Sequence, residues 1–331
     1  MYVRTQVSAR ELTTFRVGGS VANVITIESR EEVSDVVRFA ESLQAPIIPV
    51  GGGSNILVPD GLLAVTFLRY APRDITVDGP IVRVSAGARW DDLVLISTQH
   101  GLRGLENLSG IPGTVGGAVA QNIGAYGAVL ADTLLSVTAF DLHEKEWRVI
   151  SSKACSFGYR SSMFSAERDR YLVTQAEFAL SRDMPLRIDY RDLADAFRDC
   201  EPTQVGVRDT VLRIRADKFP SLTEFGTAGS YFMNPVLDAR SAYAVAERYP
   251  GMPTFHLPEG GVKVPLAWLI DHVLGMRGQI HRGVEVWRGQ SLVLAAHENA
   301  TSSDVRRLAS HIARRVFEET NIHITPEVRE L

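Results

Sequence analysis

The chain has few cysteines, no long apolar run and no excess of positive charge, and each shortage excludes a class of protein. Cys155 and Cys200 are the only cysteines among 331 residues, too few for a disulfide scaffold or a thiolate zinc site. The eight histidines show no metal-ligand spacing, so we expect no bound metal. A net charge of −4 argues against a nucleic acid partner. Because MYVRTQVSAR lacks the apolar core of a signal peptide and no run is long enough to span a bilayer, we expect a cytoplasmic protein without membrane insertion.

Glycine is plentiful instead, and much of it gathers in one stretch. The segment Gly104–Gly127, GLENLSGIPGTVGGAVAQNIGAYG, has glycine at positions 104, 110, 113, 116, 117, 124 and 127 among small or apolar neighbours. A backbone so poor in side-chain bulk adopts positive φ readily and lets a flat or anionic group approach closely. Connections are usually about 4–6 residues long. We therefore interpret this segment as a long binding loop and not as a plain structural turn.

A second glycine cluster, Pro49–Val58 (PVGGGSNILV), overlaps the end of the apolar run Ala45–Val50. We expect Gly51–Asn55 to be a strand-to-strand turn whose amides form an anion-binding nest. Neither cluster fits a common nucleotide signature: Gly51–Ile56 lacks the final glycine of the dinucleotide fingerprint, and the chain contains no Gly-Lys-Ser/Thr. Taken alone, the GGGSN run is also compatible with an ordinary turn.

Together, the two glycine clusters resemble those of the UDP-N-acetylenolpyruvoylglucosamine reductase (UDP-N-acetylmuramate dehydrogenase) family, in its longer subgroup. Further blocks in the same order extend the resemblance over nearly the whole chain: Thr13–Gly19 (TTFRVGG), Phe157–Phe164 (FGYRSSMF), Ala228–Pro235 (AGSYFMNP), Ala267–Asp271 (AWLID) and Pro326–Arg329 (PEVR). Several blocks in order are more specific than any one of them. The resemblance implies a flavoprotein oxidoreductase of peptidoglycan synthesis, and with it a part in cell wall biogenesis, cell shape, the cell cycle and cell division.

The fold class that follows is α+β. The resemblance implies a two-subdomain FAD-binding unit of the vanillyl-alcohol-oxidase (PCMH) type and a C-terminal α+β substrate domain. We expect the first subdomain over residues 1–69, the second over 70–204, the substrate domain over 205–321, and a segment over 322–331 that returns to the flavin site. Within the second, residues 181–204 are expected to be an insertion, because charge rises there and Pro185 and Pro202 interrupt the periodicity. A chain of 331 residues is long enough for such domains, and we expect a monomer.

Hydrophobic periodicity and turn signals predict the elements within these parts. Ser29 and Glu32 form a capping-box pattern that predicts a helix over Arg30–Gln44, and Asp78-Gly79 predicts a hairpin turn. Ser302 or Ser303 is expected to begin the helix over Ser303–Glu319. The other elements expected are strands at Ala22–Ile27, Ala45–Val50, Leu62–Leu68, Ile75–Val77, Ile81–Ser85, Leu134–Phe140, Trp147–Ile150, Tyr171–Leu180 and Gln290–Ala296, and helices at Trp90–His100, Val207–Lys218, Ala239–Glu247 and Val264–Val273.

The reaction implied by the resemblance has two halves. NADPH reduces non-covalently bound FAD, and the reduced flavin passes hydride to C3 of UDP-N-acetylglucosamine enolpyruvate, whose C2 is then protonated. The resemblance assigns Arg160 to the substrate carboxylate, Ser230 to the protonation of C2, and Glu327 to a place beside the reacting carbon. A guanidinium fork suits a carboxylate that gains charge, and a hydroxyl at contact distance can protonate a strongly basic carbanion. Outside these blocks, the ordinary interpretations are a surface ion pair, a turn residue and a solvated tail residue.

The resemblance also assigns binding residues. Lys218 suits a diphosphate or carboxylate as a point charge, and Asn234 offers both a donor and an acceptor to the substrate. Arg215 and Gln290 are further substrate candidates, and Tyr190, in LRIDYRDL, aligns with a tyrosine on a mobile loop that closes over the UDP diphosphate. The cofactor-binding residues are Gly51, Gly52, Gly53, Ser54, Asn55, Ile111, Pro112, Gly113, Thr114, Gly117, Ala118, Asn122, Gly124, Ala125 and Tyr126.

The sequence departs from the family pattern at three single positions and in one three-residue stretch. Met233 stands where a lysine is frequent, Trp287 where a histidine is expected, and Gly289 where a polar residue is common, which leaves Gln290 as its substitute. Arg89–Asp91 lacks the Asn-Trp-His that usually follows the Gly-Ala pair. These departures affect binding details and not the three residues assigned to the reaction.

Two other functions stay open from the sequence. The first is an FAD-dependent oxidase of the same fold; many such enzymes tether flavin through a Ser-Gly-Gly-His block, whereas Gly52–Asn55 offers no tether. The second is a flavin or nucleotide-sugar binding module without catalysis. Release of flavin on acid precipitation argues against a covalent oxidase, and faster reoxidation of reduced flavin by the enolpyruvyl sugar nucleotide argues against a binding module.

Overall fold

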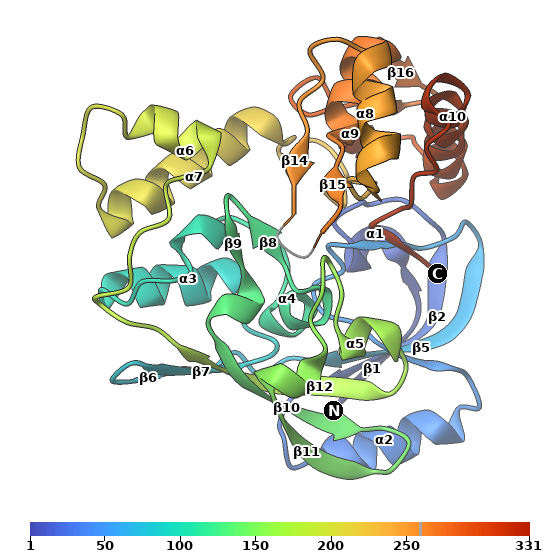
Figure 1. Ribbon diagram of the computed structural model, residues 1–331. Helices are drawn as coiled ribbons and strands as arrows, with labels where there is room; N and C mark the ends of the chain where they lie inside the picture. Colours follow the sequence, from blue (N-terminus) through green and yellow to red (C-terminus); the bar gives the residue numbers. More distant parts are fainter. Residues whose placement is uncertain (258–259) are drawn as a thin grey trace. The chain divides into compact units, whose positions relative to one another are not determined.

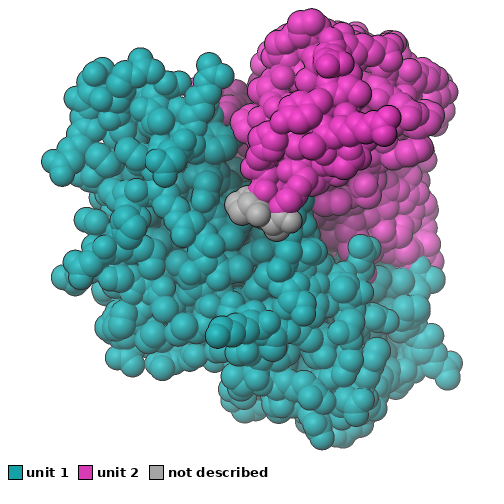
Figure 2. All heavy atoms as spheres, in the orientation of Figure 1, with its two compact units in different colours: residues 1–7, 21–53, 64–216 teal, residues 8–20, 54–63, 217–331 magenta. Residues whose placement is uncertain are grey.

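The computed structural model describes residues 1–257 and 260–331, which form two compact units. Unit 1 comprises residues 1–7, 21–53 and 64–216, and unit 2 comprises residues 8–20, 54–63 and 217–331 (Figure 2). Each unit is thus built from three separate segments of the chain. The finer division expected at residues 69, 204 and 321 stays a prediction.

A four-stranded sheet in the order β1-β2-β5-β3 forms one part of unit 1 (Figure 1). Strands β3 and β5 are parallel, with Ile47 opposite Thr66. Helix α2 packs on this sheet through Val36, Val37 and Ala40, which lie at helical spacing and are buried with residues of β2 and β5. The elements are β1 (Tyr2–Ser8), β2 (Ser20–Ile27), α2 (Val33–Ser42), β3 (Ile47–Pro49) and β5 (Leu62–Tyr70).

The predicted start of α2 was wrong. Its N-cap is Glu32, which makes no side-chain capping hydrogen bond, so the expected Ser29–Glu32 capping box does not form. The Glu32 carboxylate instead accepts hydrogen bonds from the Glu28 amide and from the amino group of Met1, the latter at 2.6 Å. Strand β1 brings the amino terminus to this turn, and a positive charge competes well for a carboxylate.

A five-stranded antiparallel sheet in the order β11-β10-β12-β7-β6 forms the other part of unit 1. The predicted hairpin at Asp78-Gly79 is confirmed: Asp78 pairs with Ile81, and Gly79 has φ +57°, as a tight hairpin turn requires. The strands are β6 (Ile75–Asp78), β7 (Ile81–Ser85), β10 (Leu134–Asp141), β11 (Glu146–Ser151) and β12 (Tyr171–Ala179).

The glycine-rich segment over residues 104–127 lies among short elements of unit 1. It was expected to be a long loop, but it contains a 3₁₀ turn, a two-turn helix and a short strand. Helix α4 forms because Thr114 accepts a hydrogen bond from the Gly117 amide at its start and because Val115, Ala118 and Val119 are buried. The remaining elements of unit 1 are α3 (Trp90–Gln99), η1 (Glu106–Leu108), α4 (Val115–Gln121), β8 (Gly124–Ala125), β9 (Ala128–Val129), η2 (Leu130–Asp132), η3 (Ser152–Cys155), α5 (Met163–Ala166), α6 (Arg191–Ala196) and α7 (Gln204–Lys218).

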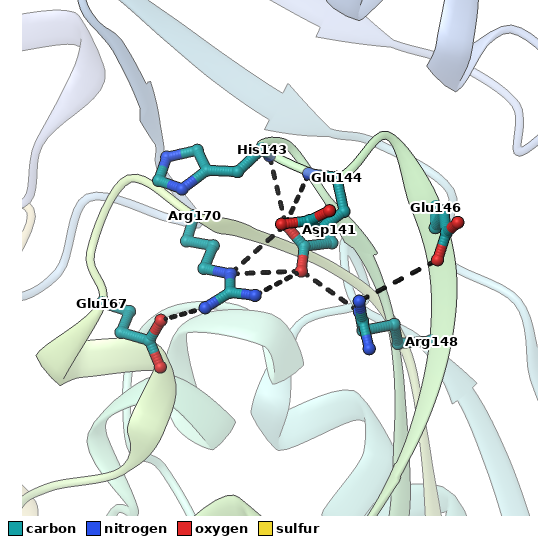
Figure 3. A network of polar contacts seen from close by, with 7 residues as sticks. All are labelled: Asp141, His143, Glu144, Glu146, Arg148, Glu167 and Arg170. Atoms are coloured by element: carbon teal, nitrogen blue, oxygen red, sulfur yellow. Dashed lines mark hydrogen bonds and ion pairs between the residues drawn. The ribbon is translucent and has the colours of Figure 1, made fainter.

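A buried carboxylate organises the turn between β10 and β11 (Figure 3). The side chain of Asp141 is fully buried and accepts hydrogen bonds from the guanidinium groups of Arg170 and Arg148, at 3.0 and 3.1 Å, and from the amides of His143 and Glu144. Burial by itself raises the pKa of Asp141, but the hydrogen bonds from Arg170 and the two amides outweigh burial and lower it. The ionised carboxylate is therefore part of the folded hairpin.

Unit 2 holds two small three-stranded sheets, in the orders β13-β15-β14 and β16-β17-β18, and a two-stranded pair of β4 with β19. Its core gathers residues from all three of its chain segments, including Phe15, Leu57 and Tyr231. The elements are α1 (Ala9–Leu12), β4 (Ile56–Leu57), β13 (Val236–Leu237), α8 (Ala239–Arg248), β14 (Phe255–His256), β15 (Val262–Lys263), α9 (Leu266–Trp268), η4 (a π-helical turn, Leu269–Val273), β16 (Ile280–His281), β17 (Val284–Val286), β18 (Leu294–Ala296), α10 (Ser302–Thr320) and β19 (Arg329–Glu330).

One expectation for unit 2 is confirmed and one needs correction. Helix α10 begins at Ser302, as expected, with Asp304 in its first turn, and its N-cap is Thr301, in a capping box with Asp304. The amides of Ser302 and Ser303 donate to the carboxylate of Asp60, at 3.0 and 2.9 Å, which a sequence pattern could not show because Asp60 lies far away in the chain. The strand expected over Gln290–Ala296 begins only at Leu294, because Gln290 starts a turn in which Val293 donates to its carbonyl oxygen at 2.9 Å.

Within the described residues, no helix combines the length and the apolar character needed to cross a lipid bilayer.

Candidate functional site

The structure brings the two glycine clusters together in unit 1. A Cβ atom added at Gly52 would lie 2.9 Å from the Cα atom of Gly113, and one added at Gly51 would lie 2.5 Å from Oγ1 of Thr114. Real Cβ contacts are essentially never shorter than 3.0 Å. The absence of side chains at Gly51 and Gly52 is therefore what allows the two backbones to touch.

The turn at Gly51–Asn55 presents amide donors. In the part of the chain that the structure describes, the amides of residues 51–55 donate no hydrogen bond to another residue. Amide groups on successive residues of a turn form a concave donor set for an anion, such as the diphosphate of a dinucleotide. This segment also has Gly53 at φ +66°, in the left-handed region that such a turn uses. The residues present therefore fit the diphosphate of FAD.

Arg160 lies against the end of the glycine-rich segment. Its Nη2 donates a hydrogen bond to the carbonyl oxygen of Gly124 at 2.6 Å, and a Cβ at Gly124 would lie 3.1 Å from Nη1. The nearby side chain of Asn122 holds the same region: its Nδ2 donates to the carbonyl oxygen of Gly158 at 2.9 Å and its Oδ1 accepts from the Ala131 amide at 3.2 Å. Asn122, predicted to bind cofactor, thus fixes the loop that carries Arg160 through Nδ2 and the turn at Ala131 through Oδ1.

Tyr126 and Tyr190 also meet in unit 1. Their rings pack edge to face with centroids 5.4 Å apart, and Tyr126 is buried whereas Tyr190 is 45% exposed. Burial raises the pKa of Tyr126 to about 12, so its phenol is neutral at physiological pH. Tyr190 lies just before α6, in the expected insertion. An exposed ring resting on the glycine-rich segment is a suitable position for a residue that covers a ligand.

Arg215 contacts the glycine-rich segment near its N-terminal end, at Gly110. Its Nε donates to the carbonyl oxygen of Gly110 at 3.1 Å, and burial lowers its pKa. Gly110 needs its lack of a side chain here, because a Cβ would lie 2.8 Å from Leu212 and the residue has φ +70°. Arg215 thus contacts the glycine-rich segment, whereas Lys218, on the last turn of the same helix, belongs to unit 2.

Sequence reasoning missed three residues that position this segment. Asp91 accepts a hydrogen bond from the Gly110 amide at 2.7 Å and a bidentate pair from Arg208 at 2.8 and 2.7 Å. Asn107, which is 2% exposed, donates from Nδ2 to the carbonyl oxygens of Tyr126 and Arg187 at 2.7 and 2.8 Å. Asp91 was noted only as part of a departure from the family pattern, and no spacing signal could have linked it to Arg208, 117 residues away.

In unit 2, the structure brings the segments of Ser230 and Glu327 together. The amide of Glu327 donates to the carbonyl oxygen of Tyr231 at 2.7 Å, and Phe232 forms an antiparallel bridge with Pro326. The Ser230 hydroxyl is half-buried and makes no hydrogen bond to any other residue that the structure describes. The two residues, 97 positions apart, are neighbours through these backbone contacts, and the hydroxyl is available to a ligand.

Asn55 also contacts the segment that carries Glu327. Its Nδ2 donates to the carbonyl oxygen of Glu327 at 3.0 Å, and its own carbonyl oxygen accepts from the Arg329 amide at 3.0 Å. The side chain of this predicted cofactor residue is therefore engaged with the C-terminal segment, while its amide remains among the donors of the glycine turn.

The other substrate candidates of unit 2 are Asn234, Gln290 and Lys218, and each of them contacts different residues. Oδ1 of Asn234 accepts a hydrogen bond from the Leu266 amide at 3.0 Å, at the start of α9, which leaves the amide group of the side chain for other partners. Gln290 directs Oε1 toward the amide of Leu292 at 3.5 Å. The carbonyl oxygen of Lys218 lies 2.9 Å from a Cβ placed at Gly289, so glycine is required where α7 ends beside Trp287.

The described geometry thus gathers the predicted residues in two groups. The group in unit 1 contains most of the cofactor residues together with Arg160, Tyr190 and Arg215. The group in unit 2 contains Ser230, Glu327 and the cofactor residue Asn55. Ile111, Pro112 and Ala118 lie within the glycine-rich segment, in or just before α4, and Ala125 lies in β8.

Two family profiles match the chain. Residues 21–148 match the FAD binding domain, and residues 221–331 match the C-terminal domain of UDP-N-acetylenolpyruvoylglucosamine reductase. These matches confirm the fold class expected from the sequence, a flavin-binding unit followed by a C-terminal α+β domain.

Whole-chain comparisons agree with the profiles. The UDP-N-acetylenolpyruvoylglucosamine reductase of Neisseria meningitidis serogroup A is 36% identical, with 98% of this chain and 96% of that protein aligned. The enzyme of the same name from Pseudomonas aeruginosa is also 36% identical, with 89% of each chain aligned. The crystal structure of UDP-N-acetylenolpyruvylglucosamine reductase (MurB) from Thermus caldophilus superposes with a TM-score of 0.70 at 26% identity, over 99% of both chains.

Proposed function

Because the chain belongs to the UDP-N-acetylenolpyruvoylglucosamine reductase family, a family of flavin oxidoreductases, we propose that it reduces UDP-N-acetylglucosamine enolpyruvate to UDP-N-acetylmuramate with NADPH as the reductant. The reaction belongs to peptidoglycan precursor synthesis. Its place in the cytoplasm and its consequences for cell shape and division are part of the proposal, as is action as a monomer.

Bound FAD would supply the hydride chemistry, accepting two electrons from NADPH and giving them to the enolpyruvyl double bond. The protein's task is then to bind, to orient and to move one proton. We assign the diphosphate of FAD to the amides of residues 51–55, and the rest of the cofactor to the glycine-rich segment that touches this turn. Support comes from the close backbone contact of Gly52 with Gly113 and from those amides themselves, which donate to no other residue among those that the structure describes.

Arg160 is the residue that we assign to the substrate carboxylate. Reduction at C3 places negative charge on C2 and on the carboxylate, and a guanidinium stabilises such charge best when its direction is fixed beforehand. The hydrogen bond from Nη2 to Gly124 fixes the guanidinium beside the cofactor segment. Because the guanidinium is planar, this bond also fixes the directions of its remaining N–H groups.

Ser230 is assigned as the proton donor to C2, with Glu327 beside it. A serine hydroxyl is a weak acid, but an enediolate-like carbanion is a strong base, so contact geometry suffices for transfer. The half-buried hydroxyl makes no hydrogen bond to another described residue, and the Glu327 carboxylate can take part in the replacement of the proton. Lys218, Asn234, Gln290, Arg215 and Tyr190 are assigned to the sugar nucleotide.

One observation carries this proposal above the others: the Glu327 amide bonds to the carbonyl oxygen of Tyr231 at 2.7 Å. It joins Glu327 to the residue that follows Ser230, so the two segments assigned to the reacting carbon lie side by side although they are distant in the sequence.

The test is an anaerobic titration in two steps. The purified protein is expected to show a flavin absorbance spectrum, to be bleached by NADPH, and to recover its spectrum when UDP-N-acetylglucosamine enolpyruvate is added. A protein that takes up no FAD ends the proposal. Bleaching by NADPH without faster recovery on addition of the sugar nucleotide identifies a binding module, and flavin that stays attached after acid precipitation identifies a covalent oxidase.

A further inference from the structure

The C-terminal strand of unit 2 is held along its whole length. Strand β19 pairs in parallel with β4, with Arg329 opposite Ile56. The amides of Arg329 and Leu331 donate to the carbonyl oxygens of Asn55 and Leu57, each at 3.0 Å. These bonds follow directly after Glu327, so the position of that residue depends on how firmly the strand is held.

Side chains reinforce this strand at its end. The phenol of Tyr231, a fully buried residue, donates to Oε1 of Glu330 at 2.6 Å. Arg306 of α10 forms an ion pair with Oε2 of the same carboxylate, with Nε at 3.0 Å, and its Nη2 donates to the carbonyl oxygen of Leu331 at 3.3 Å. The Glu330 carboxylate thus has two partners, the hydroxyl of Tyr231 and the guanidinium of Arg306.

Tyr231 is the residue after Ser230, and its main chain and side chain bind two different points of the same strand. The carbonyl oxygen accepts from Glu327, and the hydroxyl donates to Glu330. Burial, followed by the bond to Glu330, raises the pKa of Tyr231, so this phenol stays protonated and donates at any physiological pH. Tyr231 thus binds the C-terminal segment at two points, in addition to the bond from Asn55 to Glu327 and the bridge between Phe232 and Pro326.

We propose that Tyr231, Glu330 and Arg306 form a C-terminal latch, a set of positioning residues that fixes the Glu327 carboxylate relative to the Ser230 hydroxyl. The latch deepens the proposed function and rests on it, because it acts on the proton transfer assigned above. None of the three residues is assigned to substrate or cofactor. They act through the backbone of residues 327–331.

A latch of this kind affects one half of the reaction. Reduction of the flavin by NADPH requires neither Ser230 nor Glu327, whereas protonation of C2 requires both in register. Displacement of a reacting group by about 1 Å can cost roughly a hundredfold in rate. Loosening of the strand should therefore slow the second half-reaction selectively.

The first experiment removes a single oxygen atom. Tyr231→Phe keeps the ring, which packs against Phe15 and Phe232, and removes only the hydrogen bond to Glu330. Stopped-flow absorbance should show an unchanged rate of flavin reduction by NADPH and a roughly ten- to hundredfold slower reoxidation by the enolpyruvyl substrate, the range for a lost hydrogen bond to a charged group.

Tyr249→Phe is the matched control. Tyr249 lies in the same unit and also donates through its hydroxyl, to the carbonyl oxygen of Glu319 at 2.9 Å. Among the described residues, its hydroxyl forms no hydrogen bond with residues 327–331. It should leave both half-reactions unchanged. Glu330→Leu serves as a second variant because it removes the oxygen that accepts from the Tyr231 hydroxyl. The double variant with Tyr231→Phe should be no slower than Glu330→Leu alone, because the bond between the two side chains is already lost in that single variant.

Hydrogen exchange provides a readout without catalysis. The amides of Glu327, Arg329 and Leu331 should be protected in the wild-type holoenzyme and should exchange at least about tenfold faster in Tyr231→Phe, while the amides of α10 keep their protection. Equal protection in the two proteins together with equal reoxidation rates overturns the latch. Faster exchange in the variant, in a protein whose wild-type form does not turn over the substrate, retains the latch as a structural device and rejects the proposed function.

Discussion

Nη2 of Arg160 donates a hydrogen bond to the carbonyl oxygen of Gly124 at 2.6 Å. The arginine assigned to the substrate is thereby attached to the segment assigned to the flavin. Arg160 also has φ +54°, a left-handed conformation that costs a non-glycine residue roughly 1–2 kcal/mol. Backbone strain of this kind persists only where the surroundings enforce it, and here the side chain of Asn122 holds the neighbouring Gly158.

Arg160→Lys should lose most of the second half-reaction. Lysine keeps the charge, but its donors all lie on one nitrogen and cannot reproduce the planar fork with which Arg160 bonds Gly124 and faces a carboxylate. We expect reoxidation of reduced flavin by the enolpyruvyl substrate to fall roughly 10²–10³-fold, the effect of removing one preorganised donor, with NADPH reduction preserved. Rapid-mixing absorbance measures both steps. Arg168→Lys, an exposed arginine of the same region, is the control; equal behaviour of the two variants would falsify the role of Arg160.

Ser230→Ala should separate the two halves in the same way. If Ser230 is the proton donor that we propose, NADPH still bleaches the flavin, whereas formation of UDP-N-acetylmuramate collapses because C2 receives no proton. Product is measured by chromatography after anaerobic mixing. Ser221→Ala, at an exposed turn of the same unit, should behave as wild type. Unimpaired product formation by Ser230→Ala removes Ser230 from the proton-donor role.

Gly52→Ala should weaken flavin binding. The new Cβ would meet the Cα atom of Gly113 at 2.9 Å, so the two glycine segments must move apart. We expect the variant to be purified with less FAD and to need more FAD for reconstitution, as measured from the absorbance ratio of flavin to protein. Gly79→Ala is the control: its φ of +57° also disfavours alanine, but a Cβ there meets nothing within 4 Å. The idea fails if both variants retain the wild-type flavin content.

Asp141→Asn should destabilise unit 1 by roughly 2 kcal/mol. Breaking a fully buried ion pair costs about 3–5 kcal/mol, and the cost is lower here because the side chains of Arg170 and Arg148 stay 28% and 43% exposed. Denaturant unfolding at neutral pH measures the change. Glu146→Gln, whose carboxylate is 69% exposed and 3.9 Å from Arg148, should stay close to wild type.

The same carboxylate predicts a pH dependence. The pKa of Asp141 is lower in the folded protein than the value of about 3.9 for an unfolded chain. Its contribution to stability is therefore complete above about pH 4 and is lost as the pH falls through the folded pKa. Wild type should lose stability in that acid range more steeply than Asp141→Asn. Parallel acid unfolding curves for the two proteins would contradict this.

The two cysteines should differ in reactivity. Cys155 is buried, and burial raises its pKa to about 11, whereas Cys200 is exposed. A thiol reagent should modify one cysteine in the native protein and both after unfolding, because the thiolate is the reactive form. Cys200→Ser should leave the native protein unreactive, as counted by mass spectrometry. Rapid modification of that variant would show that Cys155 is accessible.

Local patterns in the sequence predicted most of the secondary structure. The Asp78-Gly79 hairpin and the helix expected over Trp90–His100 each depend on residues a few positions apart, and both appear in the structure. The predicted capping box of α2 failed because a distant residue had intervened. The amino group of Met1 donates to the carboxylate of Glu32.

The sequence by itself determined the family, the flavin-binding class and the residue types available for the chemistry, because these follow from ordered motifs. Only the tertiary structure decided which distant residues meet: Gly52 with Gly113, Arg160 with Gly124, and Glu327 with Tyr231. The physical reason is that a motif records local backbone requirements, whereas contacts across a hundred residues depend on how the sheets and helices pack. Asp91 and Asn107 position the glycine-rich segment, and Glu330 positions the C-terminal strand, only because of that packing. No local sequence pattern predicts these roles.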